Sequence, residues 1–443
     1  MNKLILLFVV IFSISKSDDL NLKYEKYTLP NGLQVILHQD NSVPLVAVNI
    51  WYHVGSAREK VGRTGFAHLF EHMLFQGSQN VGDDEHFRLV EDAGGDINGS
   101  TNNDRTNYYE VVPSQFLEMA LWLEADRMGF LLPSMTQAKL DNQRDVVKNE
   151  RRQRVDNQPY GRVMEKVSDL LYEKEHTYNW PVIGSMADLS SASMDDIKEF
   201  FKLYYAPNNA SMVISGDFNL EQTKEWISKY FSTIKKGVPV SDVVANQATL
   251  NSPKRDMMED RVNLPMLALA WHTTPLLGKD DPALTILSNI LAGGKNSRLY
   301  KTLVYDKQIA QSVSGFEYGR EISGIFMMNI TAKPGVTLTE IEKIVNDEIS
   351  KLQNEKPTER ELNRSKNSLK SGFIYSLQSV LSKADQLNEY NTFWSNPGAY
   401  KDDLARLEKV TTSDVQEAAK KYLGANRVTF SVVPIGKKEL AAQ

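Results

Sequence analysis

The sequence GFAHLFEHMLFQG, residues 65–77, sets His68, Glu71 and His72 into a run that is otherwise apolar. On a helix, residues four apart share a face and residues three apart lie beside each other, so both imidazoles can point at one ion with the carboxylate next to it. In zinc sites with the spacing H-x-x-E-H, two neutral imidazoles hold the metal and the carboxylate activates water. The alternative is a pair of histidines buried in an apolar helix. We expect a zinc-binding helix in which Glu71 is the general base.

The composition is that of a globular protein with room for at least two domain cores: 443 residues, 41% hydrophobic, 24% charged and 9% aromatic. The formal net charge of −5, with acids and bases interspersed, offers no basic patch and argues against nucleic-acid binding. Cys is absent, which excludes disulfides, thiolate metal sites and cysteine nucleophiles. Any metal must therefore be held by His and carboxylates.

The first residues, MNKLILLFVVIFSISKSDD, combine one Lys, a short apolar run and the small residues that follow it. This pattern predicts a signal peptide at residues 1–17, cleaved after Ser15 or Ser17, because the apolar run is short for a membrane span. The alternative is an uncleaved membrane anchor. We expect an exported protein, periplasmic in a bacterium or otherwise secreted, with no membrane span once the signal is removed.

One order of predicted elements occurs twice along the chain. In the first copy, LVAVNIWYHVGS predicts a strand before the zinc helix, and DINGSTNNDRTNYYEVVP predicts a pair of strands after it. A long helix, begun by Ser134, is predicted at residues 134–155, and ASMVISGDF predicts a last strand. In the second copy, NLPMLALAWHTTP, DDPALTILSNILAGG and RVTFSVVPIG resemble the first strand, the zinc helix and the last strand. A repeat of about half the chain predicts two copies of one α+β unit.

This repeat divides the chain into an N-terminal domain at residues 18–235, a Gly-, Pro- and Ser-containing linker at 236–253, and a C-terminal domain at 254–443. Pairing Gly77 with Gly293 aligns the zinc helix with its counterpart. The three residues that then replace the H-x-x-E-H side chains are Leu284, Leu287 and Ser288. We therefore expect the second domain to have no metal site.

A catalytic zinc site has three protein ligands and keeps one position for water, so a third ligand is needed. A carboxylate is expected, because the remaining histidines are in no comparable pairing. Glu150 lies on a predicted amphipathic helix and shares a face with Gln143. Spacing alone does not separate it from other acids such as Glu124 and Asp145.

HLFEH, followed by the glutamate of RDVVKNE and by a second half without the motif, resembles the pitrilysin or insulinase-type inverzincin peptidases. The similarity is nearest to bacterial and mitochondrial-processing-peptidase-like members and covers nearly all of the chain after the signal segment. It implies a LuxS/MPP-like fold of two homologous α+β domains, each a mostly antiparallel sheet packed with helices. It further implies that His68, His72 and Glu150 bind one zinc ion per chain.

The segment NGSTNNDRTNYY resembles the part of the family that offers an edge strand to a bound peptide. The substrate contacts that this resemblance implies are Asn98, Gly99, Ser100 and Thr101. One departure lies near the metal: the family commonly has a second glutamate where this chain has Gln143. Carboxylates beside metal ligands orient them, so an amide is expected to weaken the site without removing it.

A second departure lies in the C-terminal domain, where family members commonly carry an Arg and a Tyr that hold the substrate. Here those places are Val304 and Gln311. The nearby side chains that could substitute are Arg298, Tyr300, Tyr305 and Lys307. The sequence thus predicts a zinc endopeptidase subunit for extended or unfolded peptides, paired with a homologous chain that lacks H-x-x-E-H and supplies the missing Arg and Tyr. The alternative is a non-catalytic structural or peptide-binding subunit on the same fold.

Overall fold

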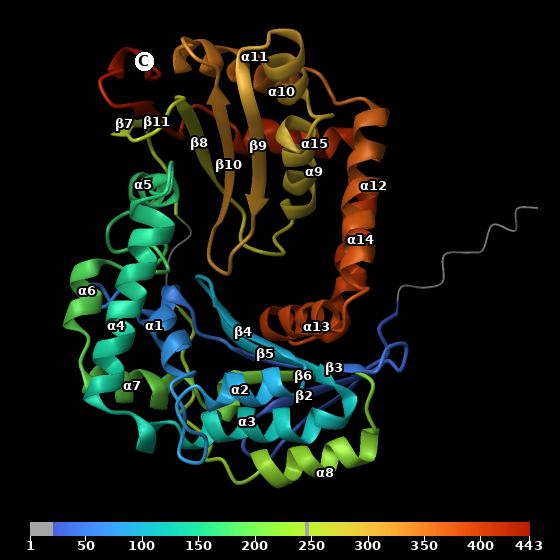
Figure 1. Cartoon of the computed structure of the whole chain (residues 1–443). Helices are drawn as coiled ribbons and strands as arrows, with labels where there is room; N and C mark the ends of the chain where they lie inside the picture. The colour runs from blue at the N-terminus through green and yellow to red at the C-terminus, as the bar shows by residue number, and fades with distance from the viewer. Residues whose placement is uncertain (1–20, 244–247) are drawn as a thin grey trace, which may run out of the picture.

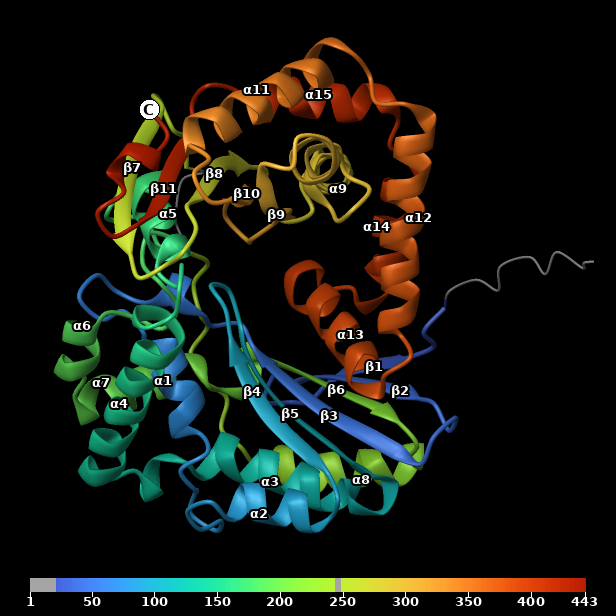
Figure 2. The ribbon, with the colours of Figure 1, turned by 45° about the horizontal axis from the view of Figure 1, so that its top comes forward.

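The computed structural model describes residues 21–243 and 248–443. It has two halves, each built on one sheet, which lie one above the other in Figures 1 and 2. The predicted signal peptide at 1–17 lies outside the described residues and stays a prediction. The predicted linker at 236–253 contains no helix or strand where it is described. Within the described ranges, no helix combines the length and apolar composition of a bilayer span.

The first sheet has the strand order β1-β2-β6-β3-β5-β4, and only the β2–β6 pair is parallel. Its strands are β1 (Glu25–Thr28), β2 (Gln34–Gln39), β3 (Leu45–Tyr52), β4 (Asp96–Thr101), β5 (Thr106–Pro113) and β6 (Ala210–Gly216). The α-helices of this half are α1 (Phe66–Met73), α2 (Glu85–Asp92), α3 (Leu117–Phe130), α4 (Gln137–Arg151), α5 (Val163–Leu171), α6 (Met186–Ser191), α7 (Met194–Tyr204) and α8 (Leu220–Phe231). The predicted start of α4 at Ser134 is wrong, because Thr136 accepts the capping hydrogen bond from Lys139 N.

The second sheet has the order β7-β11-β8-β10-β9, again with one parallel pair, β7–β11. Its strands are β7 (Lys254–Asp260), β8 (Met266–Thr273), β9 (Ala310–Tyr318), β10 (Gly324–Ala332) and β11 (Val428–Pro434). The α-helices are α9 (Asp281–Ala292), α10 (Arg298–Tyr300), α11 (Leu338–Asn354), α12 (Glu359–Ser376), α13 (Val380–Trp394), α14 (Tyr400–Lys409) and α15 (Thr412–Tyr422). Apart from β1, the two sheets match strand for strand, which confirms the predicted repeat of one mostly antiparallel α+β unit.

Each half lends one helix to the sheet of the other half. Helix α13, from the second half, packs on β3 and β6 of the first sheet, with Leu387 fully buried and Asn388 Nδ2 donating to Asn49 O at 2.9 Å. Helix α5, from the first half, packs on β8 and β11 through Val167 and Leu171. Figure 2 shows α13 above the first sheet and α5 beside β11. Both sheets are therefore covered on two faces, which explains why every residue of the central strand β6 is buried.

Candidate active site

Three side chains from two helices converge beside the edge strand β4. Helix α1 carries His68 and His72, whose rings lie 4.8 Å apart between centroids, and α4 carries Glu150. Glu150 Oε2 lies 3.1 Å from His72 Nε2 and 3.7 Å from His68 Nε2. The structure thus brings together the three side chains that the resemblance implied as metal ligands.

These three side chains fit a zinc ion. One donor atom from each lies within 4.8 Å of the other two, and donors about 2 Å from a common zinc must be this close. The buried Oε2 of Glu150 has no hydrogen-bond donor in good geometry, so the carboxylate has a free acceptor where an ion would lie. Burial lowers the pKa of His68 to about 4, which leaves its imidazole neutral as a metal ligand requires. In the described ranges this is the one group of His and carboxylate side chains with such a geometry.

The start of α1 is held by a glycine and a buried carboxylate. Gly65 has a left-handed φ of 86°, and a Cβ there would lie 2.7 Å from Ile183 O, so only glycine fits. Glu59 accepts hydrogen bonds from Gly65 N at 3.0 Å, Ala67 N at 2.8 Å and Trp180 Nε1 at 3.1 Å. Burial raises the pKa of Glu59 to about 8, although these donors oppose the shift.

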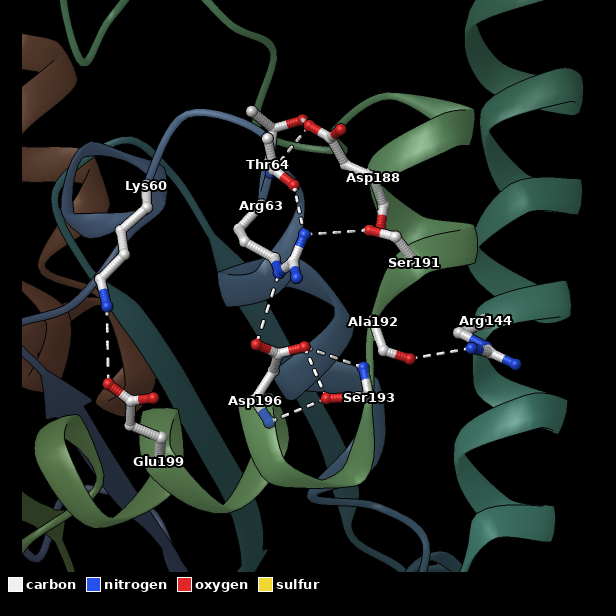
Figure 3. Close-up of polar contacts among 11 residues, drawn as sticks. Lys60, Arg63, Thr64, Arg144, Asp188, Ser191, Ala192, Ser193, Asp196 and Glu199 are labelled. Carbon is white, nitrogen blue, oxygen red and sulfur yellow. Dashed lines mark hydrogen bonds and ion pairs between the residues drawn. The ribbon is translucent and has the colours of Figure 1, made fainter.

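The loop before α1 is bound to helix α6, and helix α4 is bound to Ala192, the residue that follows α6 (Figure 3). Thr64 donates to Asp188 from its backbone N and its Oγ1, at 3.0 and 2.6 Å. Arg144, on α4, donates from Nη1 to Ala192 O at 2.8 Å. The helices that carry the two histidines and Glu150 therefore share one support, which fixes their relative position.

Glu71 projects from α1 toward Thr101 on β4. Thr101, the last residue of β4, donates from Oγ1 to Glu71 Oε2 at 2.6 Å, and burial raises the pKa of Glu71. A Cβ on Gly99 would lie 3.1 Å from Glu71 Cγ, so glycine lets the strand approach the helix closely. A carboxylate beside three metal-ligand side chains, held by one hydroxyl, can accept a proton from water.

The structure places the other predicted contacts as follows. Strand β4, which carries Asn98 and Ser100, pairs only with β5 and is therefore an edge of the sheet. Ser100 donates from Oγ to Asn107 Oδ1 at 2.6 Å. Gln143 is buried on α4, but among the described residues it forms no hydrogen bond with the candidate ligands.

The two rival acids for the third ligand lie elsewhere. Glu124 is fully buried in the first-half core and accepts from Arg127 Nε at 2.8 Å, while the exposed Asp145 pairs with Lys148. Sequence reasoning missed the support from Glu59 and Asp188. Glu59 precedes the helix by too many residues for a capping pattern, and Asp188 is distant in the chain, so neither gave a local signal.

Comparison with known proteins gives two family matches. The description "Insulinase (Peptidase family M16)" matches residues 34–180, and "Peptidase M16 inactive domain" matches residues 191–369. The chain is 31% identical over 375 residues to the zinc protease PqqE of Helicobacter pylori, covering 83% of each protein. It is 24% identical over 420 residues to a probable mitochondrial-processing peptidase subunit beta of Arabidopsis thaliana, covering 92% of this chain and 77% of the relative.

Solved structures resemble more than nine tenths of the chain. A crystal structure of a protease from Helicobacter pylori has a TM-score of 0.87 and 29% identity, covering 93% of this chain and 99% of that chain. A structure described as a peptidase M16 inactive domain from Pseudomonas fluorescens has a TM-score of 0.84 at 19% identity, covering 95% of this chain and 99% of that chain. The second likeness concerns the fold alone.

Proposed function

This chain belongs to the insulinase family, peptidase family M16, and on that premise we propose that it is the zinc-bearing subunit of an endopeptidase for extended or unfolded peptides. The observation that carries the proposal is the meeting of His68, His72 and Glu150 beside Glu71, at the open edge of β4. Relatives described as zinc proteases support the same activity.

In this proposal each side chain has one task. His68, His72 and Glu150 hold the metal. Zinc, when bound, supplies Lewis acidity that lowers the pKa of water and polarises a peptide carbonyl. Glu71 accepts the proton of the attacking water and passes it to the leaving amine, while Thr101 fixes the orientation of its carboxylate.

The edge strand β4 gives the peptide a place to bind. Its free backbone groups can pair with an extended chain, which binds through main-chain hydrogen bonds and tolerates many sequences. Gly99 allows this strand to lie close to Glu71, so a peptide paired on β4 passes near the general base. A segment must be extended to pair with β4, which is why we propose extended or unfolded peptides.

The replacement Glu71→Gln tests the proposed mechanism. The amide cannot accept a proton, so hydrolysis should fall by about 100-fold or more while zinc content stays near one per chain. Metal analysis and peptide turnover of the purified protein measure both, with the exposed Glu91→Gln as a control. Full activity of Glu71→Gln would refute the mechanism, and full metal affinity of Glu150→Gln would refute the third ligand.

We propose further that a homologous partner supplies the substrate-holding Arg and Tyr. Arg298 is already bound by two hydrogen bonds to Glu361, at 2.7 and 2.9 Å. Tyr305 is 64% exposed, and Figure 1 shows α10, which precedes it, at the end of the second half far from α1. Val304 packs against the second core. In the part of the chain that the structure describes, Arg298 and Tyr305 therefore form no hydrogen bond or ion pair with the predicted metal ligands.

The partner proposal is tested by assaying the pure chain on unfolded peptides, alone and with a homologous chain that lacks H-x-x-E-H. We expect association and a large gain in turnover, since poorly positioned substrates lose on the order of 100-fold in rate. Full turnover by the isolated chain, or no association, would contradict the proposal. Val304 and Gln311 also support a second candidate function, a non-catalytic peptide-binding subunit. Zinc-dependent hydrolysis by the reconstituted pair would exclude it.

A further inference from the structure

A cavity of about 280 Å³ lies where the two halves meet, next to the candidate active site. We name it the interdomain pocket. Its apolar and aromatic walls are Val155, Met164, Trp180, Phe316, Tyr318 and Ile325. The first three come from the first half and the other three from β9 and β10 of the second half. Its size is near the lower end for ligand sites, about 300 Å³, so it suits one large side chain better than a whole ligand.

Elements that hold the candidate active site also form this pocket. Asn103, in the pocket wall, follows β4 two residues after Thr101, which binds Glu71. Val155 lies on the π-helical turn η4 (Arg152–Asp156), which continues α4 beyond Glu150. Trp180 donates to Glu59, the carboxylate at the start of α1. The pocket is thus continuous with the end of the strand that we propose for peptide binding.

The surface that the pocket offers to a ligand is mainly apolar, because the two charged side chains in its wall, Glu165 and Arg320, interact with other residues. Glu165 pairs with Arg151 at 2.8 Å. Arg320 lies over the Tyr178 ring, 4.1 Å from its centroid. By contrast, Met164 and Tyr318 are 46% and 43% exposed, although both are large apolar or aromatic side chains. An apolar side chain that enters here would cover them.

We propose that the interdomain pocket binds one large apolar side chain of the peptide substrate and so sets a sequence preference. This inference rests on the proposed peptidase function. The pocket lies beyond the Thr101 end of β4, so a peptide that runs antiparallel to β4 directs residues on the amino-terminal side of the cleaved bond toward it. The second half of the chain thereby takes part in substrate choice, although the candidate metal ligands all lie in the first half.

The test compares peptides that differ at one position, with Leu, Lys or Gly placed in turn at each site around the cleaved bond. We expect one position at which Leu raises kcat/KM about 10- to 100-fold over Lys and Gly, the range for burying one large apolar side chain. Met164→Glu should reverse the preference at that position and favour Lys. Because Met164 is exposed, this variant should keep the fold. Phe316→Ala gives a second, uncharged variant that should lower the Leu preference.

The matched control is Val43→Glu, which adds the same charge at a residue that is 42% exposed. Val43 lies just before β3, and the turn that contains Asn103 of the pocket lies beside the other end of this strand. The eight residues of β3 span about 25 Å, so Val43 is far from the pocket. This control should keep the Leu preference. No preference at any position, or a preference that Met164→Glu and Phe316→Ala leave unchanged, would overturn the inference.

Binding separates this inference from the proposed function. The same peptides, labelled with a fluorophore, are titrated with zinc-loaded Glu71→Gln and followed by anisotropy. If the Leu peptide binds more tightly and Met164→Glu removes this difference in affinity, the pocket is supported. This holds even if no peptide is hydrolysed, because a lack of hydrolysis would refute only the peptidase function. Hydrolysis with equal binding and turnover of all peptides would keep the function and refute the pocket.

Discussion

Helices α1 and α9 occupy corresponding places beside two sheets whose strand orders match apart from β1. Helix α1 carries candidate metal ligands, whereas α9 packs into the core of the second half. The motif side chains of α1 are partly exposed, and its two histidines, His68 and His72, face Glu150 from α4. At the aligned positions of α9, Leu284 and Leu287 are fully buried in the second core, and Ser288 is buried too. The repeated scaffold thus accommodates either a cluster of candidate metal ligands or a packed core at this place, and three side chains distinguish the two.

The largest expected effect comes from removing a metal ligand on one side of this comparison. His72→Ala should lose zinc and lower hydrolysis by at least about 100-fold, because losing even a residue that only supports a ligand costs up to that much. The counterpart Ser288→Ala should change neither. Metal analysis and peptide turnover provide the measurements. Equal losses in both variants would mean that the second half also takes part in metal binding.

The next effect concerns the exchanged helices. Leu387→Ala, on α13, should destabilise the protein by about 2–5 kcal/mol, because it removes a fully buried side chain from the face of the first sheet. Since α13 belongs to the second half and α5 packs on the second sheet, we expect both halves to unfold in one calorimetric transition at a lower temperature.

The exposed Tyr375→Ala is the control and should stay within about 0.5 kcal/mol of the parent. Two separate transitions in Leu387→Ala would show that the halves are independent domains that merely touch. The exchange would then have no role in their cooperativity.

The sequence allowed the repeat and the motif helix to be predicted because both depend on local periodicity. His68, Glu71 and His72 lie within two turns, and the aligned strands show the same alternation of side chains. The exchange of α5 and α13 could not be predicted in this way. A helix with an apolar face indicates that the face is buried, but it does not indicate which sheet, hundreds of residues away, covers it.

The candidate site shows the same limit. Glu150 shares a helical face with Gln143, but helical periodicity could not choose between Glu150 and the acids Glu124 and Asp145. Only the family resemblance pointed to Glu150, and the structure now places it beside both histidines. Glu59 had no local signal at all, since its partners are backbone N–H groups six and eight residues further along the chain.

A smaller effect on stability is expected when the carboxylates at the starts of α1 and α9 are replaced. Glu59→Ala should destabilise the protein by about 1–3 kcal/mol and lower activity, because two buried N–H groups lose their acceptor. Glu59→Gln should cost less below pH 8, since burial raises the pKa of Glu59 to about 8 and an amide resembles the protonated carboxyl. Denaturant unfolding measures both variants.

The matched control is Asp280→Ala at the start of α9. Asp280 forms an ion pair with Lys421, a largely exposed partner, so its loss should cost less than about 1 kcal/mol. If Asp280→Ala proved as costly as Glu59→Ala, the buried carboxylate would not be what distinguishes α1 from its counterpart.

The last comparison concerns the pKa values and the partners of the buried carboxyl groups in each half. In the first half, Glu110 and Glu124 both bind Arg127, and burial raises the pKa of each to about 7. In the second half, burial and the neighbouring Asp281 raise the pKa of Glu317 to about 8. The pair of Glu317 and Asp281 has no guanidinium bound directly to it among the described residues, so it keeps its proton to higher pH.

A raised pKa means that the folded protein binds the proton of Glu317 more tightly than the unfolded chain does. Its contribution to stability is therefore complete below the ordinary glutamate pKa of 4.5 and is lost as pH rises through about 8. Glu317→Gln keeps a hydrogen-bonding side chain beside Thr273 but cannot lose a proton. The free energy of unfolding of the parent, minus that of Glu317→Gln, should thus fall as pH rises between these values, and Asp281 takes up part of the titration. Urea unfolding at several pH values measures this difference, with the exposed Glu355→Gln as control. A difference that is flat or rises with pH would mean that Glu317 is ionised in the folded protein, and that the second half holds its buried carboxyls in the same charged state as an ordinary surface pair.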